Sequence, residues 1–356
     1  MEYSLGEHLR ELSGPLLLTG HTGFKGTWMT FLFEELNVPV IGFSLSPEKD
    51  SLYEKSKRQG AIPEEYGDVR NYDALKTFIE LHKPSTIIHM AAQPLVLKSY
   101  ENPLYTFETN VMGTANILDI AFKTNFVQAV VIVTTDKVYK NNGSGIKFVE
   151  SDSLLGKDPY SASKVGTESV VSAWQQIAKV FGGPKVVSVR AGNVIGGGDL
   201  AKDRLIPDII RSHTSRKPLI VRNQKSTRPW QHVLDPLSGY IIAVESLLQG
   251  KLIDTINFGP NEKSLEVAKV VEICSKFLNF DFQIQDLSAA SQDMESASLE
   301  LDINYAIQSL NWRPVYSQDF AIQKTINWWK NVLEKKEIPS SMCIKDTIDF
   351  LTLIKH

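Results

Sequence analysis

Short, continuously apolar runs alternate with segments of helical periodicity through the first half of the chain, and this alternation limits the possible folds more than any other feature. Runs of this kind are typical of parallel strands that are buried on both faces. The intervening segments, such as 26–37 and 110–124, carry apolar residues at helical spacing and imply right-handed crossovers. We therefore predict an α/β fold built on a Rossmann-type, doubly wound parallel sheet. The predicted strands are Leu16–Thr19, Val38–Phe43, Thr86–Ala91, Ala129–Thr135 and Lys185–Arg190.

The character of the chain changes after residue 190, and a second, smaller lobe is expected there. Segment 191–204 is glycine-rich and charged, 222–230 is basic and loop-like, and helical patterns occupy 265–278 and 320–333. We predict that the chain returns to the first lobe in between. The expected domains are a dinucleotide-binding domain at 1–190 with a return segment at about 231–257, and a C-terminal α/β substrate-binding lobe at 191–230 and 258–356.

The charges are nearly balanced, with 38 basic and 41 acidic residues, so neither nucleic acid nor a membrane surface is the expected partner. Cys274 and Cys343 lie far apart without ligand spacing, which predicts neither a disulfide framework nor a metal site. The first fifteen residues lack the pattern of a signal peptide, and no apolar run approaches the roughly 20 residues that span a bilayer. We expect a soluble, cytoplasmic protein.

The stretch TGHTGFKG, residues 19–26, directly follows the first predicted strand and opens a helical segment. Glycines at 20, 23 and 26 permit a tight turn and let backbone N–H groups approach a pyrophosphate at the helix N-terminus. An ordinary strand-to-helix turn can also need glycines, but this position in the first unit favours a dinucleotide site. Lys25 would be either a solvated helix residue or a contact on the ribose-phosphate side.

The sequence leaves the choice between NAD and NADP open at the second strand. Its end, residues 43–47, carries neither the acidic residue that is typical of NAD sites nor an arginine. Asp68, followed by Val69, is a candidate for accepting a hydrogen bond from the adenine amine. The alternative is that Asp68 caps the helix that begins near Tyr72.

Tyr160 and Lys164 are candidate catalytic residues, which a helix would place on one face. A lysine ammonium near the phenol would lower its pKa, so that the phenolate could act as a general base. Thr135, Asp136 and Lys137 lie at the C-terminal end of a buried strand, at the edge of the sheet where active sites of this fold lie. Thr135 could bind a substrate oxygen, while Asp136 and Lys137 could supply an acid and a base; the alternative is a surface turn.

Several motifs, in this order, resemble those of the extended short-chain dehydrogenase/reductase family, also called the NAD-dependent epimerase/dehydratase family. They are TGHTGFKG, AAQP at 91–94, TNVMGT with Asn110, TTDK at 134–137 and the Tyr160–Lys164 pair. Within that family, KDPYSASK and RPWQHVLDPLSGY are similar to segments of the bacterial CDP-glucose 4,6-dehydratases. The chain departs from that branch at Val138 and Lys140 and at Leu155–Gly156, which leaves the sugar and the base open.

The resemblance implies a bound NAD that is recycled in each turnover, and a nucleotide-sugar substrate. Tyr160 would deprotonate the sugar 4-hydroxyl as hydride leaves C4, water would be lost across C5–C6, and the hydride would return to C6. Asp136 would protonate the departing hydroxyl, and Lys137 would remove the C5 proton. The expected cofactor contacts are Gly20, Thr22, Gly23, Phe24, Lys25, Asp68, Val69, Ala91, Ala92, Gln93, Thr109, Tyr160 and Lys164.

For the substrate diphosphate, the resemblance indicates Asn193, and guanidinium groups suit its oxygens. The candidates are Arg204, Arg222 and Arg228, with Arg228 favoured. Trp230 would stack on a base or ribose, or else lie in the core. His21 and His232 have no obvious partner, and His89 is expected to be a core histidine.

Three other functions remain open on the sequence. They are a 4,6-dehydratase of a GDP-, UDP- or dTDP-linked sugar, a nucleotide-sugar 4-epimerase, and a catalytically silent, cofactor-sensing regulator. An epimerase does not need Asp136 and Lys137, and a regulator would not need Tyr160 and Lys164, so these residues favour dehydration. The resemblance also implies a homodimer formed through the two long mid-domain helices, one of which carries Tyr160.

Overall fold

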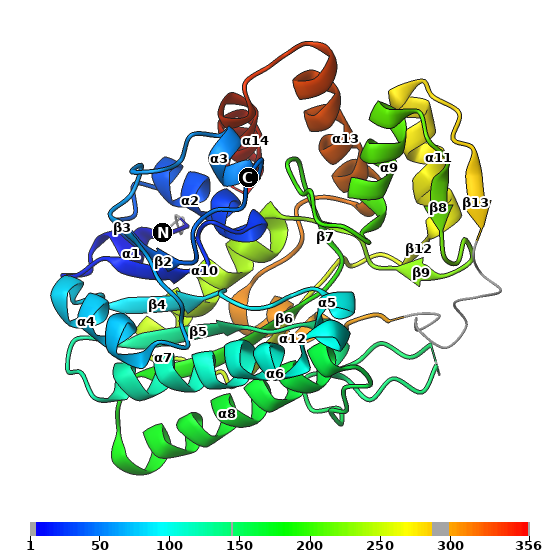
Figure 1. The fold of residues 1–356 in the computed structure, drawn as a ribbon. Helices are drawn as coiled ribbons and strands as arrows, with labels where there is room; N and C mark the ends of the chain where they lie inside the picture. The colour runs from blue at the N-terminus through cyan, green and yellow to red at the C-terminus, as the bar shows by residue number, and fades with distance from the viewer. Residues whose placement is uncertain (1–4, 144, 287–298, 355–356) are drawn as a thin grey trace.

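A sheet of seven parallel strands forms the centre of the protein, in the order β11-β6-β5-β4-β1-β2-β3 (Figure 1). The computed structural model describes residues 5–143, 145–286 and 299–354. The strand order changes direction between β1 and β4, which creates a topological switch point. The strands are β1 (Leu16–Thr19), β2 (Val40–Ser44), β3 (Glu64–Tyr66), β4 (Thr86–His89), β5 (Ala129–Val133), β6 (Lys185–Ala191) and β11 (Thr255–Phe258).

The five strands predicted from the sequence are confirmed, although β4 and β5 end two residues earlier than expected. The two edge strands of the sheet, β3 and β11, were not predicted from the sequence. β3 reads Glu-Glu-Tyr and is largely exposed, so it lacks the apolar run on which the other assignments depended. β11 lies in the part of the chain where only a return to the first lobe was expected.

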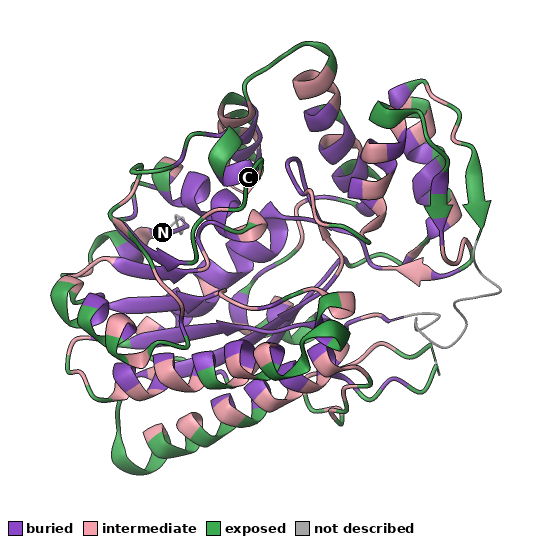
Figure 2. Cartoon of the chain, in the orientation of Figure 1, coloured by how far each residue is buried: buried purple, intermediate pink, exposed green. Residues whose placement is uncertain are grey.

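Helices cover both faces of the sheet, which confirms the doubly wound arrangement (Figures 1 and 2). Successive residues of a strand face opposite sides, so Leu18 packs with Trp28 of α2 (Phe24–Glu35) and with α10 (Leu234–Leu248). Leu17 packs on the other face with α4 (Tyr72–His82), α7 (Gly113–Phe122) and α8 (Pro159–Phe181). Two hydrophobic layers therefore enclose the strands, which are buried along their whole length in β1, β2, β4 and β5.

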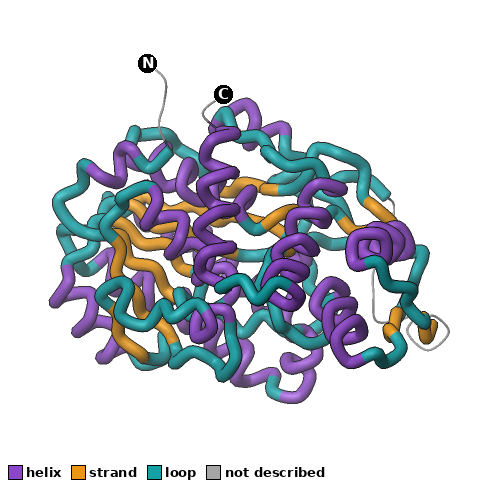
Figure 3. Tube along the Cα trace, turned by 90° about the horizontal axis from the view of Figure 1, so that it is seen from above, coloured by secondary structure: helices purple, strands orange, loops and turns teal. Residues whose placement is uncertain are grey.

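A second lobe carries short paired strands and lies at the end of the molecule away from β3 (Figures 1 and 3). Its pairs are parallel β7 (Val194–Ile195) with β10 (Gln231–His232), antiparallel β9 (Thr227–Arg228) with β12 (Leu265–Glu266), and parallel β8 (Leu219–Val221) with β13 (Ile284–Asp286). Its helices are α9 (Leu205–Ser215), α11 (Val267–Leu278) and α13 (Gln318–Glu334). α12 (Asn304–Leu310) instead packs against β11 and α10 of the first lobe (Figure 1). The last helix, α14 (Pro339–Ile354), packs back against α2.

Short helical segments complete the described chain. Between β4 and α7 the chain forms α5, α6 and a short π-helical stretch, η1, all of which contact α8. A single 3₁₀ turn, η2, follows β5 and contains Asp136 and Lys137. These segments are α1 (Glu7–Arg10), α3 (Leu52–Lys55), α5 (Val96–Glu101), α6 (Pro103–Phe107), η1 (Glu108–Met112) and η2 (Asp136–Val138).

Candidate active site

The glycine-rich turn after β1 packs backbone against backbone on the segment that follows β4. Gly20 has φ +75°, and a Cβ there would lie 2.7 Å from the Ala91 nitrogen. A Cβ on Gly26 would lie 2.1 Å from the Gly20 carbonyl oxygen, so α2 starts directly against the turn. Gly23 is the N-cap of α2 and supplies no side-chain cap. The first-turn N–H groups of α2, at Phe24 and Lys25, therefore face a cradle suited to a phosphate group.

The expected cofactor contact Thr22 lies next to the end of β2. Its hydroxyl is 2.7 Å from the Ser44 hydroxyl and donates to the Leu45 carbonyl at 2.9 Å. Thr22 thus fixes the turn against the residues where a ribose selector would stand.

His21, whose partner was not evident from the sequence, is fully buried beside the exposed edge strand. Its Nε2 lies 2.8 Å from a carboxylate oxygen of Glu64 on β3, which also accepts a hydrogen bond from the Tyr53 hydroxyl. Burial lowers the pKa of His21, while the hydrogen bond and charge of Glu64 act to raise it. Glu64 was missed because β3 has no strand signal in the sequence.

The alternative reading of Asp68 as a helix cap is wrong. Asn71 is the N-cap of α4 and accepts a hydrogen bond from the Ala74 N–H at 3.2 Å. Asp68 instead accepts hydrogen bonds from Arg70, from its backbone N–H at 2.9 Å, its Nε at 3.0 Å and its Nη2 at 2.7 Å. Val69 beside it is buried.

The AAQP segment is joined to α8 by one buried amide. Asn110 accepts from the Gln93 N–H at 2.8 Å, and its Nδ2 donates to the Gln93 carbonyl and to the Ser163 hydroxyl. Ala91 and Ala92 are half-buried on this segment. The hydroxyl of Thr109 is buried and has no hydrogen-bond partner within the described part of the chain.

Tyr160 and Lys164 are both buried in the first turns of α8, whose N-terminus is closed by a capping box between Asp158 and Ser161. Burial raises the pKa of Tyr160 to about 12, and the Thr135 hydroxyl and the Arg204 charge act to lower it. The effect of the Lys164 ammonium on the pKa of Tyr160 stays a prediction. Lys164 Nζ donates to the Val133 carbonyl at 3.0 Å. Burial also lowers the pKa of Lys164 to about 8.

Asp136 is fully buried, so the reading of its position as a surface turn is wrong. Its carboxylate accepts hydrogen bonds from the Thr135 hydroxyl at 3.0 Å and from Asn193 Nδ2 at 3.3 Å. A Cβ on Gly192 would overlap this carboxylate, so the glycine makes room for it. Lys137 Nζ lies 3.5 Å from Asp136, and its side chain is 40% exposed. An acid and an amine therefore stand side by side next to Thr135.

The structure brings one of the three predicted arginines into this cluster. The charge of Arg204, whose Nη1 lies 3.0 Å from Asp199, reaches both Lys25 and Tyr160. Arg222 pairs instead with Asp203 at 2.7 Å. Arg228 lies on β9 and donates to the Thr227 carbonyl.

The remaining side chains singled out in the sequence lie in the interior. Trp230 is buried, and its backbone N–H donates to Gln318, so it takes the core position. His89 is buried with Nδ1 2.7 Å from the Thr19 hydroxyl, and burial lowers its pKa to about 3. His232 is buried between Trp28 and Tyr316.

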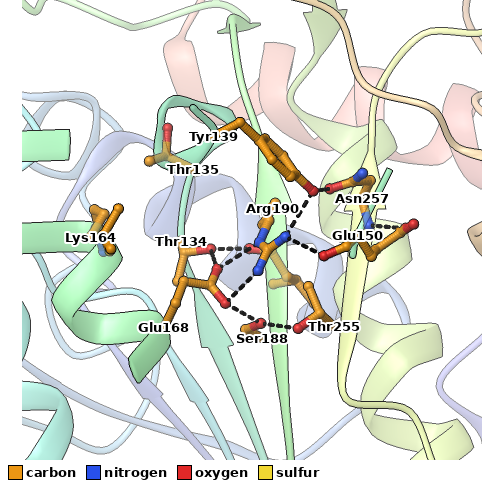
Figure 4. A network of polar contacts seen from close by, with 12 residues as sticks. Thr134, Thr135, Tyr139, Glu150, Lys164, Glu168, Ser188, Arg190, Thr255 and Asn257 are labelled. Atoms are coloured by element: carbon orange, nitrogen blue, oxygen red, sulfur yellow. Dashed lines mark hydrogen bonds and ion pairs between the residues drawn. The ribbon is translucent and has the colours of Figure 1, made fainter. Parts of the chain in front are cut away.

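Two buried clusters beside the site were missed by the sequence reasoning. Tyr240, the last residue of RPWQHVLDPLSGY, accepts a hydrogen bond from Lys25 Nζ at 2.8 Å. Glu168 and Arg190 form a buried ion pair below Thr134 (Figure 4). The one available signal was spacing, because Glu168 lies one helical turn after Lys164.

The residues around the glycine-rich turn fit a dinucleotide. The glycine cradle and the open first turn of α2 suit its diphosphate. Thr109 in η1, next to Asn110, carries a buried hydroxyl that has no hydrogen-bond partner in the described part of the chain. In the described chain no group of histidines, cysteines or carboxylates is arranged to hold a metal ion. None of its helices is both long and apolar enough to cross a membrane.

Comparison with known proteins gives consistent matches over nearly the whole chain. Residues 16–259 match the model of the NAD dependent epimerase/dehydratase family. CDP-glucose 4,6-dehydratase of Salmonella typhimurium is 40% identical over 88% of this chain and 90% of its own. The dTDP-glucose 4,6-dehydratase of the same organism is 25% identical over 88% and 92%. The crystal structure of a Bacillus anthracis dTDP-glucose 4,6-dehydratase with NAD superposes with a TM-score of 0.77 at 22% identity, covering 91% of this chain and 98% of that one.

Proposed function

The chain belongs to the NAD dependent epimerase/dehydratase family, and from that premise we propose that it converts CDP-glucose to CDP-4-keto-6-deoxyglucose. The observation that carries the proposal is the buried Asp136 with Lys137 beside it, next to Thr135 and Tyr160. Dehydration needs an acid and a base at C6 and C5 in addition to the groups that act at C4. An epimerase needs only the groups that act at C4.

The glycine cradle and the open first turn of α2 would hold NAD, which would supply the hydride acceptor for C4 and the hydride donor for C6. Tyr160 takes the proton of the sugar 4-hydroxyl, while the Thr135 hydroxyl, which acts to lower the pKa of the phenol, orients the same oxygen. Thr135 and Arg204 both favour the phenolate against the effect of burial.

Oxidation at C4 acidifies the C5–H bond, and elimination then needs two groups on the same segment. Lys137 takes the C5 proton, and Asp136 protonates the departing C6 hydroxyl. Gly192 and Asn193 shape the space around the Asp136 carboxylate. In this proposal Arg204 binds the diphosphate of the nucleotide sugar at the border of the two lobes, with Asn193, Arg222 and Arg228 as further candidates.

The enzyme is expected to act as a homodimer. Apolar side chains are exposed on α6 and η1, which pack against α8: Leu104 is 71% exposed and Met112 is 55% exposed. A second copy packed on this face would bury them. Sedimentation of the purified protein and of Leu104→Glu tests this, because a dimer built on this face should weaken in the variant.

The function is tested by incubating the purified protein and NAD with CDP-glucose and, separately, with its dTDP-, GDP- and UDP-linked counterparts. A product lighter by one water from CDP-glucose supports the proposal. The same mass loss from another nucleotide alone would reassign the base. A product of unchanged mass but altered sugar would point to epimerisation, and turnover of none of them to a cofactor-sensing protein.

A further inference from the structure

A buried polar network lies next to the candidate catalytic segment, Thr135–Lys137. The centre of this network is the Glu168–Arg190 ion pair (Figure 4). The side chains of the pair are only 5% and 4% exposed. Arg190 meets the carboxylate with two nitrogens, Nε at 2.8 Å from Oε1 and Nη2 at 2.9 Å from Oε2. The two oxygens also accept from the hydroxyls of Thr134 at 2.5 Å and Ser188 at 2.8 Å. Each carboxylate oxygen therefore accepts two hydrogen bonds.

The same pair reaches the segment that follows Lys137. Arg190 Nη1 donates to the Tyr139 hydroxyl at 2.8 Å and to the Glu150 carbonyl at 3.0 Å. The Tyr139 hydroxyl donates in turn to Asn257 on β11 at 2.7 Å. The guanidinium also lies 4.9 Å from the centre of the Tyr139 ring.

Thr134 and Tyr139 flank the three residues assigned to the chemistry. The network thus holds Thr135–Lys137 from both ends: through Glu168 before it and through Arg190 after it. A buried ion pair is weak evidence for stability, because desolvation offsets its attraction. A network that is fully hydrogen-bonded does, however, restrict the groups attached to it to one arrangement.

We propose that Glu168 and Arg190 are positioning residues for the elimination step, which set the Asp136 carboxylate and the Lys137 amine against C6 and C5 of the sugar. This inference rests on the proposed dehydratase function. Neither residue touches the substrate; both act through Thr134 and Tyr139. Because the network is attached to both ends of the acid–base segment, its loss affects the C5–C6 step more than hydride removal at C4.

Two mild substitutions release one end of the segment each and leave the ion pair in place. Tyr139→Phe removes the hydroxyl between Arg190 and Asn257, and Thr134→Val removes the hydroxyl bound to Glu168. The matched control is Thr255→Val, which removes a bond to Ser188 at 2.8 Å in the same network but touches no part of the segment. Direct substitution of Arg190 would leave the Glu168 charge buried without its partner, so folding could fail.

The experiment measures kcat and KM of the holoenzyme with CDP-glucose and the deuterium isotope effects on kcat with substrate labelled at C4 or at C5. We expect kcat to fall roughly 10- to 100-fold in Tyr139→Phe and Thr134→Val, the size of effect that misplacement of reacting groups produces. KM should stay near the wild-type value, the C5 isotope effect should rise and the C4 effect should shrink. Thr255→Val should match the wild type in all of these.

A fall in kcat with both isotope effects unchanged would overturn the proposal, since it would mean a smaller active fraction. So would unchanged kinetics in both variants, or an equal loss in Thr255→Val. Failure of the proposed function is seen separately, because the wild-type enzyme would then form no dehydrated product.

Discussion

Lys25 Nζ donates a hydrogen bond to the Tyr240 hydroxyl at 2.8 Å and joins the first turn of α2 to α10. Of the two alternatives for Lys25, the solvated helix residue is therefore wrong, and the cofactor contact stays a prediction. Its amine lies in the candidate active site, where burial, and then the charges of Arg204 and Lys164, lower its pKa to about 7 against the opposing charge of Asp136. An amine that titrates near neutral pH has consequences for both stability and chemistry.

Lys25→Met should change how stability depends on pH. The Lys25 amine titrates near pH 7 in the folded protein, whereas an unfolded lysine titrates near 10.4. Between these values the unfolded chain binds the extra proton, so wild-type stability should rise with pH relative to the variant, by up to about 1.4 kcal/mol per pH unit. Urea unfolding of both proteins at pH 7, 8 and 9 measures this difference. A difference that does not vary with pH would contradict the lowered pKa of Lys25.

Asp235→Asn should show the opposite trend. Asp235 is buried at the start of α10, where its carboxylate accepts from the Val315 N–H at 2.6 Å, and burial raises its pKa to about 7. Between about pH 4 and 7 the folded state binds the extra proton, so wild-type stability should fall with rising pH relative to the variant. Unfolding curves at pH 5, 6 and 7 test this, with the exposed Asp254→Asn as the control. Parallel behaviour of the two variants would count against the assignment.

Tyr160→Phe should lower kcat by a factor of about 10² to 10⁴, the usual contribution of a positioned general base. The fold should be retained, since only one hydroxyl is lost. Product formation from CDP-glucose is the measurement. Tyr305→Phe, which alters a partly exposed tyrosine on α12, is the matched control and should keep full activity.

Asp136→Asn should block water loss while leaving substrate binding intact. Asparagine keeps the volume and the contact with Asn193 but cannot donate a proton as a carboxylic acid does. We expect the yield of product lighter by one water to fall by about 10²-fold or more. Calorimetric titration with CDP-glucose should give an affinity close to that of the wild type. A variant that dehydrates at the normal rate would remove Asp136 from the mechanism.

Arg204→Met should move the pH profile, and Arg222→Met should not. The Arg204 charge acts to lower the pKa of Tyr160, and Arg222 pairs with Asp203 instead. Loss of Arg204 should raise KM for the nucleotide sugar and shift the rise of kcat with pH to higher pH, because the phenolate forms less readily. Rate profiles between pH 6 and 10 for both variants make the comparison. Identical shifts of the pH profile in the two variants would show that the effect does not come from the action of the Arg204 charge on Tyr160.

Part of the site was predictable because its residues are close in sequence. Thr135, Asp136 and Lys137 directly follow a buried strand, and Tyr160 and Lys164 are one helical turn apart. Their partners were not predictable, since they come from other elements. Glu64 is 43 residues from His21, and Tyr240 is 215 residues from Lys25.

The sequence by itself determined the core strands, the glycine turn and the order of the catalytic motifs. Apolar runs and glycine positions reflect short-range requirements, namely burial on both faces and a close backbone turn. Only the tertiary structure decided that Asp136 is buried, that Lys164 turns to the Val133 carbonyl, and that the charge of Arg204 acts on Tyr160. Burial and charge depend on which elements become neighbours, and that depends on the packing of the whole chain.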